Sequence, residues 1–189
     1  PGTDAAFALA MCQVIVTEEL ADLDFVRSQT DLPLLVNKET RRFIRGSDID
    51  QEAREDQFYW WDENTDQMMP APRNTLKLGE AAPALEGGWQ LSLLDDSTVA
   101  VTTVWQLMCE RLVDYTPDEA SAICGVNAGV IRDLARSIAA KRTKILEGFN
   151  AAKYYHGDLM ERAMCLVLAL TGNWGRKGAG IQGLALAGL

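Results

Sequence analysis

The chain has 189 residues with 27 acidic and 18 basic side chains, which gives a formal net charge of −9 at pH 7. This balance argues against a broad nucleic-acid interface, because binding to phosphates needs clustered lysine and arginine. Hydrophobic residues make up 48% of the sequence, which excludes a disordered chain and is enough to bury a core. The chain opens at Pro1 without an initiator Met and stops after a glycine-rich stretch. We therefore expect an internal piece of a longer polypeptide.

Signals for a membrane segment or a metal site are missing from the sequence. No basic segment precedes an apolar run as in a signal peptide, and the longest apolar run, Ala163–Leu170, is too short to cross a bilayer. The four cysteines lie far apart without a C-x-x-C pair, whereas zinc and iron–sulfur sites have closely spaced ligands. We therefore expect no direct membrane insertion, no metal ligands, and free thiols at Cys12, Cys109, Cys124 and Cys165.

The predicted elements begin with helices in residues 1–30. Residues 4–20 are rich in alanine and place apolar side chains at helical spacing, and Thr3 or Asp4 is able to cap this helix. A second, short helix is predicted from about Asp22.

Residues 31–104 are predicted to form a mostly β insertion between two helical parts. Short apolar runs separated by turn residues and prolines replace the helical spacing. The expected elements are a hairpin of Leu34–Val36 with Phe43–Arg45, an aromatic strand at Phe58–Trp61, an irregular segment at Met68–Arg73, and a hairpin of Trp89–Leu94 with Thr98–Val104.

Helices return in residues 105–189. Thr116 and Pro117 form a strong helix start, and Gly172 suits the end of the last helix. The apolar face of the third helix is expected to hold Val130, Ile131, Leu134 and Ile138. The expected elements are helices at Trp105–Tyr115, Pro117–Gly125, Ala128–Ala140 and Gly157–Leu170, and a short buried strand at Ile145–Phe149. Together the three parts predict an α/β fold whose helical ends flank the β insertion.

Three polar segments are candidates for a binding site, and the first is the opening Pro1–Asp4. Unpaired backbone N–H groups at a helix start attract polar or anionic groups. The Asp4 carboxylate is able either to cap its own helix or to accept hydrogen bonds from the N–H edge of a guanine ring.

The second candidate segment is Lys153–Asp158, which contains His156, the only histidine of the chain. Lys153 and His156 are able to donate hydrogen bonds to an electron-rich ring or to an oxyanion. The alternative remains open, because a lone histidine is more often a structural hydrogen-bonding group.

The third candidate segment is Thr171–Gly180, with four glycines and two cations in ten residues. Such a loop lets a ligand approach the backbone closely, and a plain surface turn explains the composition equally well. It is not a phosphate-binding P-loop, because the order G-x-x-x-x-G-K-[ST] is missing.

The order of the segments along the chain is more specific than any one of them. The chain contains, in succession, PGTDAAFALAMCQVI, TPDEASAICGV, IRDLARSIA, KYYHGDLMERA and LTGNWGRKGAGI. In this order the blocks resemble the dimethyl-sulfoxide-reductase family of molybdopterin oxidoreductases. The resemblance is strongest to the branch of nitrate, selenate and (per)chlorate reductases and of dimethyl sulfide and ethylbenzene dehydrogenases.

The resemblance implies an internal fragment of a catalytic alpha subunit, in which two molybdopterin guanine dinucleotides hold one molybdenum. It implies an enzyme that catalyses oxygen-atom transfer or C–H hydroxylation of a small-molecule substrate. Lys153 and His156 would stand next to the reacting centre and assist catalysis. The implied cofactor contacts are Thr3, Asp4, Lys153, His156, Thr171, Gly172 and Asn173.

The same resemblance implies several properties of the parent protein. Residues 1–30 and 105–189 would belong to its cofactor-binding domain, with residues 31–104 inserted between them. A 4Fe-4S cluster, an iron–sulfur partner subunit for electron transfer and a periplasmic location are expected. The cluster ligands and the molybdenum ligand lie upstream in this family, so the piece by itself is expected to be inactive.

Two other interpretations of the sequence remain open. A nucleotide-dependent dehydrogenase would use the glycine-rich tail for a pyrophosphate, but the arrangement of strand, G-x-G-x-x-G and helix is missing. The other alternative is a cofactor-free structural or interaction domain derived from the same family.

Overall fold

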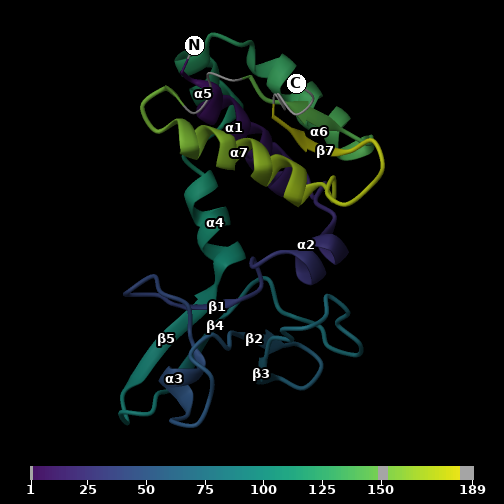
Figure 1. Ribbon diagram of the computed structural model, residues 1–189. Helices are drawn as coiled ribbons and strands as arrows, with labels where there is room; N and C mark the ends of the chain where they lie inside the picture. The colour runs from purple at the N-terminus through teal and green to yellow at the C-terminus, as the bar shows by residue number, and fades with distance from the viewer. Residues whose placement is uncertain (1, 149–152, 184–189) are drawn as a thin grey trace. The chain divides into compact units, whose positions relative to one another are not determined.

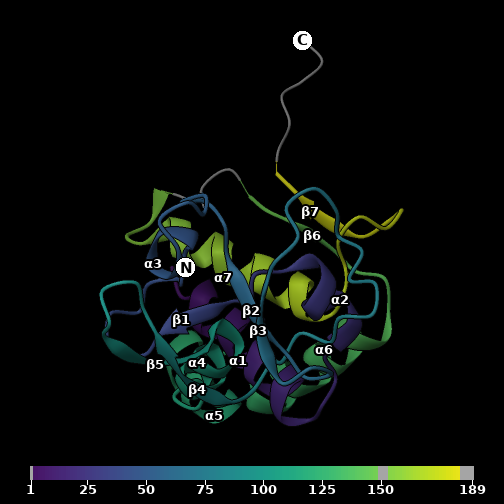
Figure 2. The same ribbon diagram turned by 90° about the horizontal axis from the view of Figure 1, so that it is seen from below.

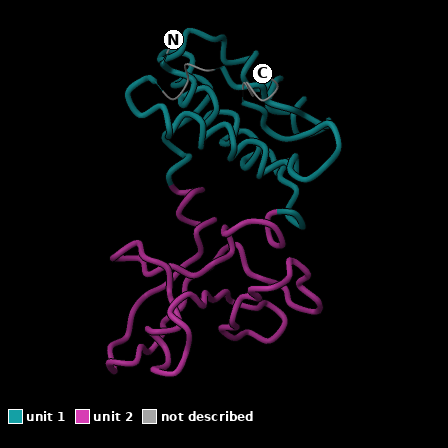
Figure 3. The backbone as a smooth tube through the Cα atoms, in the orientation of Figure 1, with its two compact units in different colours: residues 1–25, 111–189 teal, residues 26–110 magenta. Residues whose placement is uncertain are grey.

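The computed structural model describes residues 2–148 and 153–183, with helices and small sheets as expected for an α/β chain (Figure 1). Contacts divide the chain into two compact units (Figure 3). Unit 1 comprises residues 1–25 and 111–189, and unit 2 comprises residues 26–110. The chain passes between the units within helices α2 (Leu23–Gln29) and α4 (Val104–Leu112).

Unit 1 is built around helices α1 (Asp4–Thr17) and α7 (Gly157–Leu170), which pack side by side (Figure 1). They run parallel: Gly2 contacts Tyr154 where both begin, and the Asp22 N–H donates to the Leu170 carbonyl, at 2.8 Å, where both end. Small and branched apolar side chains allow the close approach. The fully buried members include Ala8, Ala10, Cys12, Ile15, Val167 and Leu168.

Helix α5 (Pro117–Cys124) begins and ends as its sequence predicts. The Thr116 Oγ1 accepts a hydrogen bond from the Glu119 N–H at 3.2 Å, and Gly125 ends the helix in the left-handed conformation.

We expect Thr116→Ala to lower the free energy of unfolding by about 1 kcal/mol, because one helical N–H loses its acceptor. Urea unfolding followed by circular dichroism measures this, with the exposed neighbour Glu119→Gln as control; an unchanged midpoint for Thr116→Ala would contradict it.

Helix α6 (Ala128–Ala140) is present as predicted, but its predicted buried face is wrong in part. Ile131 and Ile138 are buried together with Ala135, whereas Val130 and Leu134 are 54% and 39% exposed. A face that includes Val130 and Leu134 and a face that includes Ala135 both fit helical spacing. The small Ala135 lets α6 approach α1 closely, so the helix turns the larger Leu134 outward.

The predicted strand between the last two helices is correct only at its start. Strand β6 (Lys144–Leu146) pairs in parallel with β7 (Gly180–Gln182). The strand is not buried, since Leu146 is 72% exposed. Phe149, the predicted end of the strand, lies outside the described residues.

Unit 2 is mostly β structure (Figure 1 and Figure 2). Its antiparallel sheet has the order β1-β5-β4. The elements of the unit are β1 (Leu35–Asn37), α3 (Gly46–Ile49), β2 (Tyr59–Asp62), β3 (Gln67–Pro70), β4 (Gly88–Ser92) and β5 (Thr98–Thr103). The core consists of Leu35, Ile44, Tyr59, Leu91 and Val101. The indole rings of Trp61 and Trp89 stack beside it at 4.8 Å.

Both predicted hairpins of unit 2 are confirmed. In the first, the Ile44 N–H donates to the Leu35 carbonyl at 3.0 Å, and the second is the pair β4–β5. The irregular segment predicted at residues 68–73 is correct only in its second part, because residues 68–70 belong to β3 and residues 71–73 lie in no helix or strand. Pro70 is tolerated there because it ends an edge strand, where no ladder partner needs its missing N–H.

Asp62 is a buried carboxylate at the β2–β3 hairpin. It accepts hydrogen bonds from the Ala82 N–H at 2.6 Å and from the Thr65 hydroxyl at 2.8 Å, and these hold the pKa of Asp62 below its usual 3.8. Because the folded-state pKa is depressed, this stabilisation is present above pH 3.8 and is lost as the pH falls through the folded-state pKa.

We expect the free energy of unfolding of Asp62→Asn to fall less steeply than that of the unaltered chain as the pH is lowered. The measurement is the urea midpoint between about pH 5 and pH 2. Glu63→Gln, at the exposed next residue, is the matched control. An acid limb that stays as steep in Asp62→Asn as in the unaltered chain would contradict the assignment.

No helix among the residues that the structure describes is long and apolar enough to cross a bilayer.

Candidate functional site

A cavity of about 470 Å³ lies where α1 and α7 begin, and we call it the α1–α7 cavity. It joins the first two candidate segments, since Gly2 and His156 both line it although they are far apart in the sequence. The floor is apolar, and tyrosine, histidine and arginine side chains supply polar groups. The floor includes Ala6, Leu9, Leu159, Met160, Ala163 and Leu166.

Gly2 forms one edge of the cavity in a conformation that favours glycine. Its φ is +79°, and a Cβ added there would lie 3.3 Å from the Tyr154 ring. The absence of a side chain thus lets the loop before α7 approach the start of α1.

Thr3 and Asp4 start α1 without capping it through their side chains. The Thr3 carbonyl accepts a hydrogen bond from the Ala6 N–H at 3.1 Å, but its hydroxyl makes no capping bond. Asp4 is the first residue of the helix and is exposed. Within residues 2–148 and 153–183 its carboxylate has no hydrogen-bond or ion-pair partner, so it is available to a ligand.

His156 stands directly before α7 in a left-handed conformation, with φ 56° and ψ 32°. Few residues other than glycine adopt this conformation, which places a sparsely populated backbone state at the cavity. Its carbonyl accepts the first helical hydrogen bond, and its imidazole packs against the Tyr155 ring with centroids 3.9 Å apart. Lys153 is exposed in the same loop but does not line the cavity.

The third candidate segment lies at the other end of α7. The 15 residues from His156 to Thr171 place it roughly 22 Å away along the helix axis. The Asn173 Oδ1 accepts from the Thr143 N–H at 2.9 Å, and its Nδ2 donates to the Ile138 carbonyl at 3.3 Å and to the Thr171 hydroxyl at 2.9 Å. These buried side chains tie the end of α7 to the end of α6 and to β6.

Both the backbone conformation at position 172 and the side chains around it favour glycine. Its φ is +62°, and an added Cβ would collide with the Asp22 carboxylate, which forms an ion pair with Arg176 at 2.9 Å. Gly172→Ala should therefore lower the free energy of unfolding by more than about 1 kcal/mol.

Gly175→Ala is the matched control in urea unfolding. Gly175 has a φ of +66° with nothing within 4 Å of its added Cβ, so it carries the backbone strain without the collision. Equal losses for the two variants would show that the contact with Asp22 adds nothing.

Sequence reasoning missed Tyr115 and Arg162, which also line the α1–α7 cavity. The available signal was the spacing of Leu159, Arg162 and Leu166, which share one face of the helix that follows His156. No group of three or more His, Cys, Asp or Glu side chains that could hold a metal ion occurs in the described part of the chain.

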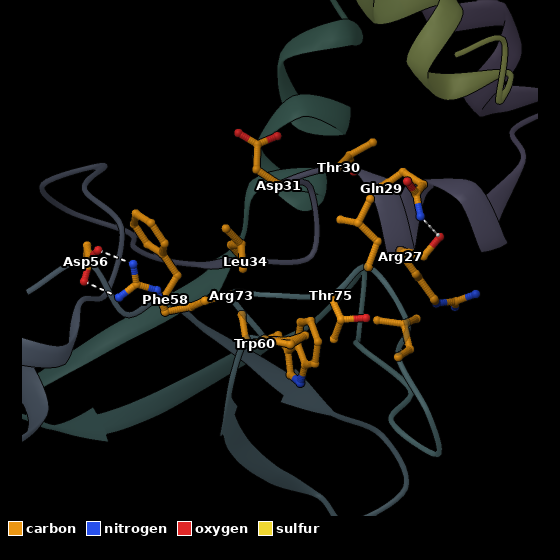
Figure 4. A pocket seen from close by; sticks show the side chains of 15 residues that line it. Arg27, Gln29, Thr30, Asp31, Leu34, Asp56, Phe58, Trp60, Arg73 and Thr75 are labelled. Carbon is orange, nitrogen blue, oxygen red and sulfur yellow. Dashed lines mark hydrogen bonds and ion pairs between the residues drawn. The ribbon is translucent and has the colours of Figure 1, made fainter. Parts of the chain in front are cut away.

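Unit 2 has a cavity of its own, of about 500 Å³, whose lining includes Leu34, Phe58, Trp60 and Thr75 (Figure 4). At one side Arg73 pairs with Asp56 (Figure 4), and hydrogen bonds from Arg54 and Arg73 lower the pKa of Asp56 to about 2. The Trp60 indole N–H is buried without an acceptor in the described residues. A second cleft of the unit, of about 720 Å³, is rich in arginine.

No family model matches the chain, but comparison with individual proteins identifies its family. It is 36% identical over 209 residues to the perchlorate reductase subunit alpha of Dechloromonas aromatica, covering 96% of this chain and 22% of the relative. The dimethylsulfide dehydrogenase subunit alpha of Rhodovulum sulfidophilum is 35% identical, and the chlorate reductase subunit alpha of Ideonella dechloratans is 34% identical. Each of these two matches covers 94% of this chain and 20% of the relative.

The chain thus spans about a fifth of the length of these relatives, which are named as alpha subunits of reductases and dehydrogenases. The matches extend over nearly all of its own residues, including the central block that lacks distinctive motifs. The chain belongs to the dimethyl-sulfoxide-reductase family of molybdopterin oxidoreductases, and the relatives that show this are catalytic alpha subunits.

Proposed function

We propose that the parent of this chain is an oxidoreductase that binds molybdenum in two molybdopterin guanine dinucleotides, and that the α1–α7 cavity faces this cofactor. The observation that carries the proposal is the meeting of the Gly2–Asp4 and Lys153–Asp158 segments at one cavity. When bound, the cofactor supplies the redox chemistry of oxygen-atom transfer or C–H hydroxylation. The segment alone is expected to be inactive.

The residues at this cavity fit one fused ring system of such a cofactor. An apolar floor suits the faces of a ring, and a few polar groups at the edge suit its heteroatoms. Asp4, two residues after Gly2, is not part of the lining, but it offers an exposed carboxylate with no partner in the described chain.

In the proposed site the two segments have different roles. Asp4 accepts hydrogen bonds from the N–H edge of a guanine, and the backbone at Thr3 positions it. His156 and Lys153 donate hydrogen bonds to the pterin or to oxyanion charge on the substrate. Thr171, Gly172 and Asn173 are buried residues, so in the proposed site they contribute by holding the loop that follows α7 in place beside the cofactor.

The proposal extends to the organisation of the parent protein. Residues 1–30 and 105–189 belong to its cofactor-binding domain, and residues 31–104 are inserted into that domain. The parent carries a 4Fe-4S cluster whose ligands lie outside this chain, works with an iron–sulfur subunit, and is periplasmic. The names of the relatives, which include reductases and a dehydrogenase, support redox chemistry of this kind.

A cofactor-free structural domain of the same family is the second candidate. The observation that favours it is the full use of the Asn173 amide in holding α6, β6 and α7 together, which needs no ligand.

Metal and pterin analysis of the purified parent protein separates the two candidates. We expect about one molybdenum per subunit by plasma mass spectrometry, together with the fluorescence of oxidised pterin and release of guanine nucleotide on acid hydrolysis. A parent protein without molybdenum or pterin would overturn the proposed function and favour the structural domain.

Asp4→Asn tests the guanine contact in the same protein. Asparagine keeps the helix start but loses the charge that strengthens the hydrogen bonds, so we expect roughly tenfold weaker retention of the guanine dinucleotide during dialysis. Asp96→Asn changes an exposed acid of unit 2, outside the lining of the cavity, and should have no effect. Equal retention in both variants would remove Asp4 from the site.

A further inference from the structure

Four of the eight basic residues of unit 2 lie close together in the sequence, in and after the turn that follows β1. Lys38, Arg41, Arg42 and Arg45 stand there against the single acid Glu39, in a chain of net charge −9. Arg41, Arg42 and Arg45 line the same cleft of about 720 Å³.

These arginines differ from most others of the chain in having no ion-pair partner. Six arginines form ion pairs: Arg54, Arg73, Arg111, Arg132, Arg136 and Arg176. Arg41, Arg42 and Arg45 are exposed and form none with the described residues. Like charges gathered at one cleft repel one another. The Asp48 and Glu55 carboxylates of the same cleft offset part of this cost, and carboxylates of a partner would offset more.

The turn that carries the arginines is held in a defined shape. The Asn37 Oδ1 accepts hydrogen bonds from the Glu39 and Thr40 N–H groups at 2.8 and 3.0 Å, and the Arg41 N–H donates to the Asn37 carbonyl at 2.9 Å. The Arg45 guanidinium lies 5.4 Å from the centre of the Phe58 ring. An ordered backbone lowers the entropy that a partner must overcome on binding.

The cleft favours a protein over a denser polyanion. Asp48 and Glu55 line it beside the arginines, and the chain as a whole is acidic, so the closely spaced phosphates of a nucleic acid would meet repulsion. A protein surface carries separate carboxylates among other groups and is able to match this mixed pattern.

We propose that the cleft of Arg41, Arg42 and Arg45 docks a carboxylate-rich surface of the electron-transfer partner of the parent enzyme. The assignment of the partner rests on the proposed function, whereas the docking surface follows from charge and geometry. Arginine suits this task because its planar guanidinium binds carboxylates through two parallel hydrogen bonds.

Arginine labelling with phenylglyoxal, located by mass spectrometry, tests the surface in the full-length alpha subunit. We expect labelling of Arg41 and Arg42 in the isolated subunit and protection of both in the assembled enzyme. Arg142, exposed and without an ion-pair partner in the described residues, should be labelled equally in both states.

Three outcomes of the labelling would overturn the proposal. Protection in the isolated subunit would assign the arginines to contacts within the parent polypeptide. Equal labelling in both states would show that the partner binds elsewhere. Protection by a single-stranded oligonucleotide, without protection by the partner subunit, would show that the cleft takes nucleic acid.

Charge reversal tests the energetics of the same contact. We expect the double variant Arg41→Glu and Arg42→Glu to raise the Kd for the partner subunit by about tenfold or more at low salt, with a smaller effect at high salt. Arg142→Glu is the control for charge reversal outside the cleft. An unchanged Kd in the double variant would overturn the proposal. Molybdenum analysis of the same preparations reports separately on the proposed function.

Discussion

Replacing His156 by glycine in the full-length enzyme is expected to lower kcat/KM per bound molybdenum by about 100-fold. His156 lines the α1–α7 cavity and is proposed to donate a hydrogen bond to oxyanion charge that develops in the reaction. Loss of one such donor typically costs a factor of 100 or more in rate. Steady-state kinetics normalised to the molybdenum content measures the effect, and the cofactor content itself reports whether His156 also holds the cofactor.

The left-handed backbone of His156 decides the choice of variants. Glycine adopts φ 56° without strain, so His156→Gly removes the imidazole and leaves the turn intact. Asparagine tolerates the same conformation and retains an N–H donor, so His156→Asn should keep more of the activity than His156→Gly. Lys77→Ala, at an exposed position of unit 2 outside the lining of the α1–α7 cavity, is the control. Full kcat/KM and full cofactor content in His156→Gly would exclude His156 from the site.

Replacing Asn173 by alanine is expected to lower the free energy of unfolding by about 3 kcal/mol. The side chain is 2% exposed and serves three partners: the Thr143 N–H, the Ile138 carbonyl and the Thr171 hydroxyl. Alanine leaves these groups without their partner, and each buried polar group left unpaired costs about 1–3 kcal/mol. Urea unfolding followed by circular dichroism measures the loss.

Two further variants show whether the loss arises from the hydrogen bonds. Asn64→Ala removes an exposed amide that donates to the Glu80 carbonyl and should cost less than about 0.5 kcal/mol. In a double-mutant cycle, Thr171→Val should cost less in the Asn173→Ala background, because the two side chains share a hydrogen bond. If Asn173→Ala lowers the free energy of unfolding no more than Asn64→Ala does, the end of α7 is held by packing and not by these hydrogen bonds.

The sequence by itself determined those features whose causes are local. The start of α5 depends on Thr116 and Pro117, which lie next to the backbone groups that they affect. The first hairpin depends on a short polar turn between apolar runs, and both it and the β4–β5 hairpin formed as predicted. Family membership was also readable from the order of the motifs, and comparison with the relatives confirmed it.

Only the tertiary structure decided which of these segments meet. The parallel packing of α1 and α7 brings Gly2 to the loop of His156, whereas the length of α7 places Asn173 at the far end of the helix. The buried face of α6 depends on how closely α1 approaches Ala135, and helical spacing fits either face. Contacts between residues far apart in the sequence leave no periodic signal along the chain, because they arise from the packing of whole elements.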